Sequence, residues 1–307
     1  MERIFDIGEY GDRVRLDGGR IAICRADRTT EFVPVGDVAM LMFSEPGLSV
    51  SVAVLAELAK NSGTAVACDR THTPVGIFQP LAAHSRATAV LLGQIAARPV
   101  LRARLWQRIV QAKIRAQSRT LDRYGRRDAE LEALARDVRR GDAENVEGHA
   151  ALRYWRRLGL FDRRDRMASD ANRPLNYAYA ILYGSCVRAL CAAGLNTALG
   201  INHRGPTNPH CLASDIMEPF RPAADAVVHD WITANPGAYD LSVACKRYLL
   251  KALLSSRWRT VQGVVPLFAA LSRAAVSLRE CLLSDSVELE IPVQVFEEED
   301  NVDACAV

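Results

Sequence analysis

The chain contains very little lysine, and arginine carries almost all of its positive charge. Among 307 residues, arginine outnumbers lysine 35 to 4, although the formal net charge is only +3. Arginine stays charged when partly buried and binds phosphate with a planar, two-pronged guanidinium. Because a high-GC genome also favours arginine codons, the positions of the arginines are more informative than their number.

Three other features are absent from the sequence. None of the eight cysteines forms a Cys-x-x-Cys pair, which favours small core residues over a zinc site or disulfides. No stretch reaches about 18 uninterrupted apolar residues, so we expect no membrane span. The first residues, MERIFDIGEYGDR, lack the apolar region of a signal peptide. We therefore expect a cytoplasmic globular protein.

Strand patterns dominate the first 80 or so residues. Val14 and Leu16 alternate with arginines, Asp17-Gly18-Gly19 offers a tight turn, and Ile21 and Ile23 resume the alternation, which predicts a hairpin. One helix is expected from about Ser51 to Asn61. The further strands that we expect are Phe32–Val35, Val38–Phe43, Thr64–Cys68 and Val75–Phe78.

Helical patterns replace the strands from about residue 85. Residues 86–140 are rich in Ala, Leu, Arg and Glu, and Pro99 is well suited to start a helix. Helical patterning continues through residues 148–160, 172–193 and 223–283. We therefore predict an α+β fold in which a small N-terminal β-rich domain precedes a larger all-helical domain.

The chain ends with a different pattern. Apolar and polar residues alternate from Val287 to Val295, and Pro292 restricts this strand to a sheet edge, before an acidic tail. Pairing within the chain and pairing with a partner both remain open. The predicted domains are a β-rich domain at 1–85, a helical domain at 86–284, and an edge-strand-like segment with an acidic tail at 285–307.

Candidate metal ligands lie on both sides of a turn-rich loop. His203 precedes this loop, and Asp215 and Glu218 follow it on one helical face. Mixed nitrogen and oxygen ligands of this kind suit Mg²⁺ or Mn²⁺. Helix capping is an alternative explanation for both acids, because acids in a first turn complement the helix dipole. Glu147, which precedes another helical run, is open to the same two interpretations.

Basic residues gather in three groups. Between Arg98 and Arg140, thirteen Lys or Arg accompany only five Asp or Glu, and two smaller groups cover residues 153–166 and 246–259. Basic helices can follow a phosphate backbone, although a solvated helix face is the alternative for each group. The residues that we assign to DNA binding are Arg102, Arg108, Lys113, Arg115, Arg153, Arg157, Arg247 and Arg257.

Several short motifs recur in a defined order. They are Glu147-Gly148-x-Ala150-Ala151, Tyr154-Trp155, Arg173-Pro174-Leu175-Asn176, Gly194-Leu195…Gly200-x-x-His203 and Leu212-Ala213-x-Asp215-Ile216-Met217-Glu218-Pro219-Phe220-Arg221-Pro222, followed by Asp225. This ordered set resembles the CRISPR-associated integrase family Cas1 over essentially the whole chain. Residues 106–114 are similar to the type II version, which is found beside Cas9-type effectors.

The resemblance implies a metal-dependent DNA endonuclease and integrase that inserts spacers into a CRISPR array. In this family, a strand's 3′-hydroxyl attacks a repeat phosphodiester. The resemblance also implies that residues 1–85 form a dimerisation domain and that residues 86–284 carry catalysis and DNA binding. Glu147, His203 and Glu218 would be both the catalytic residues and the ligands of Mg²⁺ or Mn²⁺, with Asp215 as an additional acid. The implied partners are double-stranded prespacer and repeat DNA, a second copy of the chain, the small protein Cas2 and the effector nuclease of the same locus.

Two other functions are compatible with the same residues. A stand-alone nuclease for branched DNA would use the same ligands and would cut without joining. A non-catalytic DNA-binding scaffold would use the acids only to cap helices. A joining assay separates the first from an integrase, and a Mn²⁺ titration separates the second.

Overall fold

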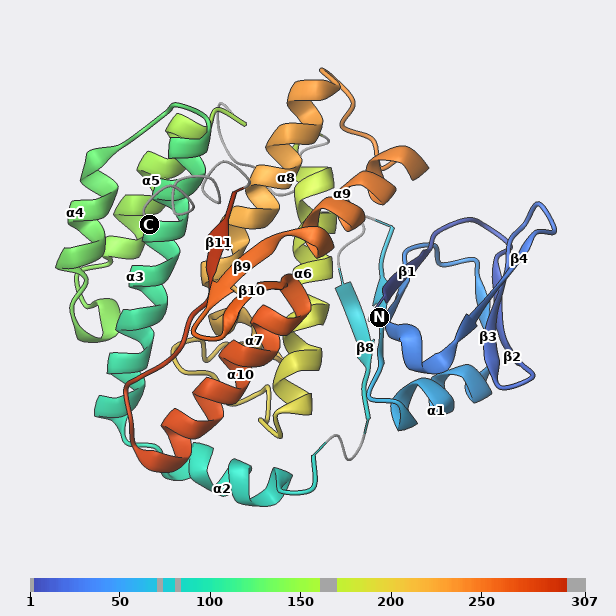
Figure 1. Cartoon of the computed structure of the whole chain (residues 1–307), viewed down its shortest axis with the longest axis horizontal. Coiled ribbons are helices and arrows are strands. Elements are labelled where there is room, and N and C mark those ends of the chain that lie inside the picture. The colour runs from blue at the N-terminus through green and yellow to red at the C-terminus, as the bar shows by residue number, and fades with distance from the viewer. Residues whose placement is uncertain (1–2, 71–73, 81–83, 161–169, 297–307) are drawn as a thin grey trace, which may run out of the picture.

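A computed structural model describes residues 3–70, 74–80, 84–160 and 170–296 of the chain. Two β-sheets form the N-terminal part, and a larger, mainly helical part follows (Figure 1). This arrangement confirms the predicted α+β fold. No helix in the described ranges is long and apolar enough to cross a membrane.

The predicted hairpin forms the centre of the outer N-terminal sheet. Gly18 and Gly19, with φ of 54° and 75°, make the tight turn in the left-handed region that glycine adopts without strain. The strand order of this sheet is β4-β3-β2-β6. Its strands are β2 (Arg13–Asp17), β3 (Arg20–Cys24), β4 (Thr30–Pro34) and β6 (Ser49–Val50).

The inner N-terminal sheet has the order β1-β5-β7-β8 and connects the outer sheet to the helices. Helix α1 (Val52–Lys60) packs against β7 of this sheet and β2 of the outer sheet. A local core forms there around Ile7, Ile21, Leu41 and Leu58. The strands of the inner sheet are β1 (Arg3–Ile7), β5 (Val38–Phe43), β7 (Thr64–Cys68) and β8 (Pro74–Phe78). All strands predicted in this region are present.

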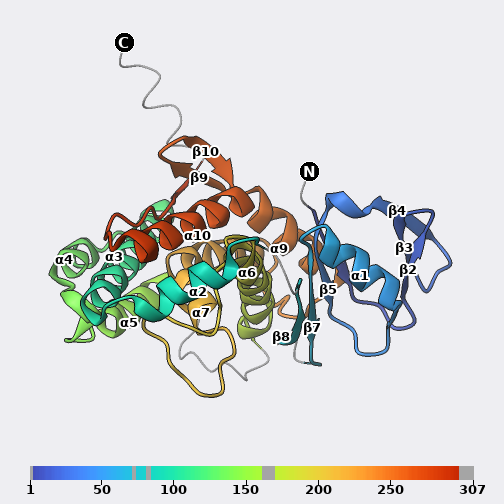
Figure 2. The same ribbon diagram turned by 90° about the horizontal axis from the view of Figure 1, so that it is seen from below.

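The inner sheet packs directly on helix α6 (Asn172–Ala192), as the view in Figure 2 shows. A Cβ atom on Gly184 would lie 2.7 Å from Met40 Sδ and 2.8 Å from Val66 Cγ2. Glycine at this position therefore allows the helix and the sheet to approach closely. Met40 and Val66 belong to the same buried cluster as the helices, so one apolar core spans both parts of the molecule.

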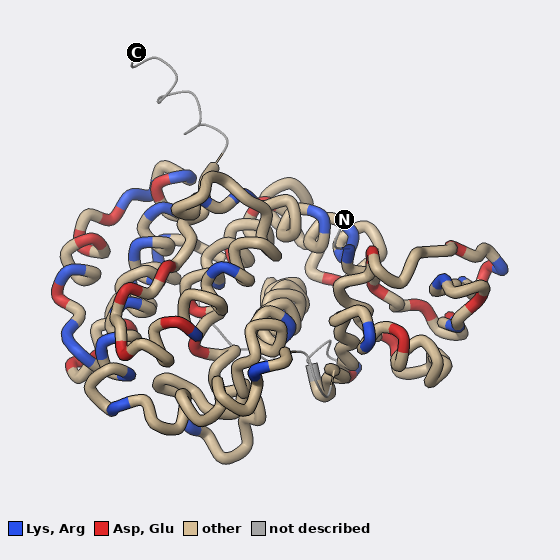
Figure 3. The backbone as a smooth tube through the Cα atoms, turned by 60° about the horizontal axis from the view of Figure 1, so that its bottom comes forward, with Lys and Arg blue, Asp and Glu red and all other residues tan. Residues whose placement is uncertain are grey.

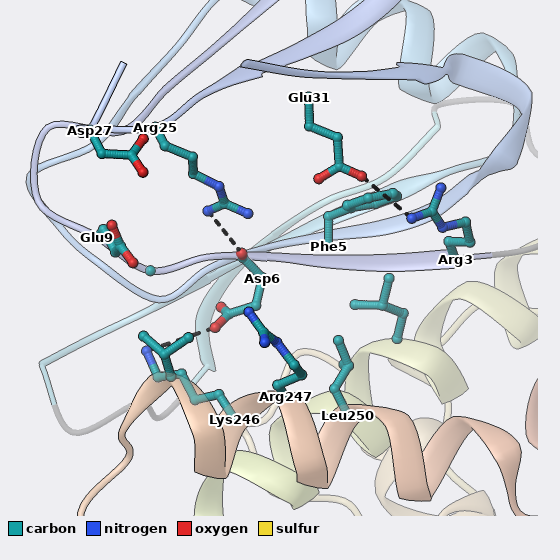
Figure 4. Close-up of a pocket in the computed structure, with 13 residues that line it drawn as sticks. Arg3, Phe5, Asp6, Glu9, Arg25, Asp27, Glu31, Lys246, Arg247 and Leu250 are labelled. Carbon is teal, nitrogen blue, oxygen red and sulfur yellow. Dashed lines mark hydrogen bonds and ion pairs between the residues drawn. The ribbon is translucent and has the colours of Figure 1, made fainter. Parts of the chain in front are cut away.

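A pocket of about 500 Å³ lies between the inner sheet and helix α9 (Val243–Ser255), and Lys246 lines it on the side of Asp6 (Figure 4). The Lys246 ammonium lies 3.8 Å from Asp6 Oδ2 and 3.1 Å from Ser44 Oγ. Its side chain is 11% exposed. Lys246 therefore contributes a polar link between the two parts of the molecule, next to their shared apolar core.

Helix α3 (Pro99–Arg123) is the long central helix of the helical part and begins at the predicted proline. It buries Leu105, Trp106, Ile109 and Ile114 along one face. The other helices are α2 (Ala87–Ala96), α4 (Ala129–Asp137), α5 (Val146–Leu158), α7 (Cys211–Ile216), α8 (Arg221–Ala234) and α10 (Leu267–Ser284), with short 3₁₀ turns η1 (Val35–Asp37), η2 (Arg140–Asp142) and η3 (Glu218–Phe220).

The helical patterning predicted through residues 223–283 is interrupted by a loop after α8 (Arg221–Ala234) and was wrong where two strands follow α9. Strands β9 (Arg257–Thr260) and β10 (Gly263–Pro266) form a hairpin between α9 and α10. Trp258 anchors it, because this side chain is 1% exposed and its ring lies 4.6 Å from that of Phe220. The buried Trp258 alternates with an arginine on each side, which is the pattern of a strand with one buried face. Burial of this side chain outweighs the helical propensity of the flanking residues.

The C-terminal strand is shorter than predicted. Within the predicted range 287–295, only β11 (Val293–Val295) pairs, and it lies antiparallel to β9 of the same chain. It is an edge of the three-stranded sheet β10-β9-β11. For these residues the structure therefore supports pairing within the chain. The acidic tail at 297–307 lies outside the described residues.

Candidate metal centre

Lys113 bridges two acids that come from different elements. Glu147 lies in the first turn of α5, Glu218 begins η3, and Lys113 lies in the middle of α3. The Lys113 ammonium is 2.5 Å from Glu147 Oε1 and 2.6 Å from Glu218 Oε2. The exposed fraction of the side chain is 13% for Lys113, 24% for Glu147 and 7% for Glu218, so water screens these charges only weakly.

Arg221 holds the second oxygen of Glu218. Its Nε donates to Glu218 Oε1 at 2.9 Å from the next turn of the chain. Burial disfavours the charged carboxylate, but the cations Arg221 and Lys113 outweigh this effect and lower the pKa of Glu218. Burial likewise disfavours the Lys113 ammonium, but Glu218 and Glu147 outweigh it and raise the pKa of Lys113. At neutral pH the cluster is therefore an array of full charges.

Asp215 is fully buried and fixes the loop that carries His203. Its Oδ2 accepts from the backbone amides of Ile201 at 2.5 Å and Asn202 at 3.2 Å, and its Oδ1 accepts from the amide of His203 at 3.1 Å. A Cβ atom on Gly200 would lie 2.9 Å from Asp215 Oδ2 and 2.3 Å from the His203 carbonyl oxygen. The loop can wrap around this carboxylate only because glycine precedes it.

Asp215 does not cap a helix, so the capping interpretation was wrong for this residue. Helix α7 begins at Cys211, its N-cap is His210, and Asp215 lies near its C-terminal end. Local sequence suggested a cap because Asp is common there, but tertiary hydrogen bonds to three loop amides decide its role instead.

The carboxylate of Asp215 also orients the imidazole of His203. The contact between Oδ1 and Nδ1 is 2.6 Å, which assigns the proton to Nδ1 and leaves the Nε2 lone pair available. This hydrogen bond is the main reason that the pKa of His203 is raised. The ring is 41% exposed and meets Trp106 edge-on, with 5.7 Å between centroids. A histidine held in this way is a typical metal ligand.

The donor set fits a divalent cation. Two carboxylates lie on either side of an ammonium, which places a positive charge between Glu147 and Glu218. Glu218 Oε2 is buried and accepts no well-aligned hydrogen bond, so it retains coordination capacity. Within the described ranges no three His, Cys, Asp or Glu side chains are already gathered at metal-binding distance. Lys113 would therefore have to leave its position for the two acids to share a divalent cation.

The structure places the predicted DNA-binding residues in several environments. Lys113 lies inside the acid cluster, and Arg102 donates to the Gln94 carbonyl at 2.7 Å. Arg153 and Arg157 pair with the buried Asp128. Of the remaining four, Arg247 lines the interdomain pocket, Arg257 is exposed on β9, and Arg108 and Arg115 line a groove beside α3. Their assignment to DNA stays a prediction.

Two residues that shape the site were not assigned to it from sequence. Arg221 lies three residues after Glu218, and this spacing on consecutive turns was a usable signal. The bridge made by Lys113 had no such signal, because 34 residues separate it from Glu147 in the chain. Basic residues are frequent on the side of the molecule that carries α3 and α4 (Figure 3).

Comparison with known proteins identifies relatives of the chain. Residues 7–238 match the family model described as CRISPR associated protein Cas1. The CRISPR-associated endonuclease Cas1 of Neisseria meningitidis is 33% identical over 247 residues, covering 77% of this chain and 81% of that protein. The CRISPR-associated endonuclease Cas1 2 of Pyrobaculum aerophilum is 27% identical, covering 90% of this chain and 98% of that protein.

Solved structures share the fold. A casposase bound to its integration product superposes with a TM-score of 0.78 at 18% identity, covering 94% of this chain and 92% of that one. A Cas1 protein from Thermotoga maritima superposes with a TM-score of 0.75 at 17% identity, covering 92% of this chain and 97% of that one. These likenesses establish a common architecture of a β-rich part and a helical part.

Proposed function

Since the chain belongs to the Cas1 family of CRISPR-associated proteins, we propose that it is a metal-dependent DNA endonuclease and integrase that inserts spacers into a CRISPR array. The observation that carries the proposal is the pair of acids, the half-buried Glu147 and the buried Glu218, which share one ammonium beside an oriented imidazole. Two curated relatives are named endonucleases, and a casposase of the same fold is bound to an integration product.

Glu147, Glu218 and His203 Nε2 would hold Mg²⁺ or Mn²⁺. When bound, the ion would supply positive charge to the scissile phosphate and lower the pKa of a bound hydroxyl. The chain's own residues prepare this site. Asp215 binds Nδ1 of His203 and so leaves the Nε2 lone pair available, and Arg221 fixes one oxygen of Glu218 so that the other can bind. Asp215 is therefore a positioning residue in this proposal.

The proposed partners are DNA, Cas2 and a second copy of the chain. A solved complex of the same fold contains Cas6, reverse transcriptase, Cas1 and Cas2, and another contains a Cas1 protein with DNA. Double-stranded prespacer and repeat DNA would be the substrates. Dimerisation through the β-rich part, the type II assignment and contact with the effector nuclease of the locus remain predictions from the family resemblance.

Substitution of the two acids tests the proposal. Glu147→Gln and Glu218→Gln should each lower joining of a prespacer to a repeat in Mn²⁺ by at least about a thousandfold, because a metal ligand is lost. Each should also weaken Mn²⁺ binding measured by calorimetry. The matched control is Glu144→Gln, since Glu144 is exposed and pairs only with Arg139 at 3.2 Å in the described ranges.

The outcomes separate the competing functions. Full joining activity in either variant would remove these acids from catalysis. Wild-type protein that cuts branched DNA without joining would be a stand-alone nuclease. Wild-type protein that binds no Mn²⁺ but retains DNA binding would be a scaffold.

A further inference from the structure

We propose that an arginine-lined groove along α3, on the opposite side of this helix from Lys113, binds the phosphate backbone of DNA. The inference deepens the proposed function, because it assigns a separate binding surface for the DNA substrate. It rests on the shape of the groove, the charge of its walls and its orientation relative to the metal centre.

The C-terminal segment forms one wall of the groove and α3 forms the other. This segment runs beside α3 from its first turn to its last (Figure 1). Arg98 pairs with Asp285 at the lower end, Arg108 donates to the Leu289 carbonyl at 3.5 Å, and Arg123 stacks on Phe296 at the upper end. Two adjoining hollows of about 410 and 520 Å³ lie along this seam and share Arg108 and Gln111.

Arginines dominate the walls of both hollows. Those that line them are Arg104, Arg108, Arg115, Arg119, Arg139 and Arg140. The acid among the lining residues is Glu290, whose Oε1 accepts from the Val261 amide at 3.0 Å. In the part of the chain that the structure describes, no carboxylate pairs with Arg104, Arg108 or Arg115. The groove is therefore strongly positive and fits an extended polyanion.

The arginine row matches the dimensions of a nucleic-acid strand. Arg104, Arg108, Arg115 and Arg119 follow one side of α3, and a rise of 1.5 Å per residue gives them a span of about 22 Å. One strand of duplex DNA rises about 3.4 Å per nucleotide along its axis, so this row corresponds to about six or seven phosphates. DNA is the extended polyanion on which the proposed function acts, so it is the occupant that we assign to the groove.

The groove contacts phosphates and leaves the bases unread. Trp258 is its aromatic lining residue, and this side chain is 1% exposed and packs on Phe220. It cannot stack on a base. Guanidinium groups bind phosphates irrespective of sequence, so this binding is sequence-independent and strongly salt-dependent.

The groove is separate from the metal centre. Lys113 and Arg115 are two residues apart on α3, so their side chains leave the helix about 200° apart. Lys113 meets Glu147 and Glu218 inside the protein, whereas Arg115 faces the groove. Pro219, the residue after Glu218, also lines the groove. The groove thus passes behind the acid cluster, where it can hold DNA without contacting the reacting phosphate.

The double variant Arg108→Gln/Arg115→Gln tests the groove in the full-length protein. Fluorescence anisotropy with a duplex of random sequence, in EDTA, gives the affinity at several salt concentrations. The slope of log affinity against log salt should become shallower by about 1.8, since each lost phosphate contact removes about 0.9. The matched control is Arg13→Gln/Arg28→Gln, which removes two exposed charges from the N-terminal part and should leave the slope unchanged.

The outcomes are decisive in both directions. An unchanged slope and affinity in the groove variant overturn the proposal. In that case the thermal stability of the groove variant would be compared with that of the wild type truncated after Phe296. An equal loss in both would identify the chain's own acidic tail as the occupant. Because the assay contains no metal, Glu147→Gln should bind the duplex as the wild type does. Failure of the proposed catalysis would therefore not be mistaken for failure of the groove.

Discussion

Two charge clusters share helix α5 but have opposite compositions. At its N-terminal end, Glu147 joins Glu218 around one lysine. In its C-terminal half, Arg153 and Arg157 share one buried acid, Asp128, and Arg153 also pairs with the exposed Glu130. Both arrangements complement the helix dipole, which favours acids at the N-terminus and bases at the C-terminus.

The difference between the clusters separates a binding site from a structural contact. Around Asp128, each carboxylate oxygen has an arginine partner, and the acid also caps α4 through the Glu130 amide at 3.1 Å. No coordination capacity remains there. Around Lys113, one ammonium is shared by two carboxylates, and an oxygen of Glu218 lacks a well-aligned hydrogen bond. Two carboxylates that meet at one shared cation are the arrangement that a divalent cation would complete.

Removal of Lys113 should have the largest effect on the stability of the acid cluster. Lys113→Met leaves two neighbouring carboxylates without their shared cation, and should lower the free energy of unfolding in EDTA by about 3 kcal/mol. Saturating Mn²⁺ should restore much of this loss, because the ion can take the place of the ammonium. Urea unfolding with and without Mn²⁺ measures both effects. A variant that is equally destabilised in both conditions would mean that Lys113 does not occupy the metal position.

Asp215→Asn should have the next largest effect. The asparagine side chain has the same shape, but its NH₂ group would face backbone N–H groups of the loop, which are also donors. We therefore expect the free energy of unfolding to fall by about 2 kcal/mol. His203 also loses its orienting partner, and Mn²⁺ affinity should fall by about ten- to a hundredfold. Calorimetric titration with Mn²⁺ measures the second effect. Wild-type affinity in a folded variant would show that Asp215 supports only the loop.

Asp128→Asn should have the smallest effect and should leave Mn²⁺ binding unchanged. Asparagine retains the helix cap, so the substitution removes mainly the ion pairs, which are worth about 1 kcal/mol because both arginines are partly exposed. Burial opposes ionisation of Asp128, but the hydrogen bonds from Arg153 and the Glu130 amide and the charges of Arg153 and Arg157 together outweigh it and lower the pKa in the folded state.

Because the pKa of Asp128 is lowered in the folded state, the loss of stability in Asp128→Asn should depend on pH. The stabilisation by Asp128 is complete above the unfolded-state pKa of about 4 and is lost as the pH falls through the lower folded-state pKa. The difference between wild type and variant, measured by urea unfolding, should therefore be constant near neutral pH and shrink in acid. A difference that grew in acid would contradict this origin.

Sequence patterns were sufficient for the architecture because they are local. Alternation predicted β2 and β3, and Pro99 predicted the start of α3. The hairpin at β9 and β10 was missed because its flanking residues form strong helices on both sides. Its strand conformation depends on the burial of Trp258 against Phe220, a contact between residues far apart in the chain.

The candidate ligands were named from ordered motifs, but their surroundings were beyond sequence. Glu147 and Glu218 were proposed as ligands with capping as the alternative. Spacing could not reveal that Lys113 lies between them, because that position depends on how α3 packs against α5 and η3. Asp215 was ambiguous for the same reason, since its hydrogen-bond partners lie on a loop that precedes its helix.

The C-terminal segment beside α3 has a consequence for biosynthesis. Protein synthesis delivers the chain from its N-terminus, so α3 leaves the ribosome long before residues 285–296. Trp258 and the edge of β9 remain uncovered until β11 arrives, and the opposite wall of the arginine groove does not exist before then. A nascent chain therefore gains this surface only after residues 285–296 have been synthesised, and products terminated before them lack it.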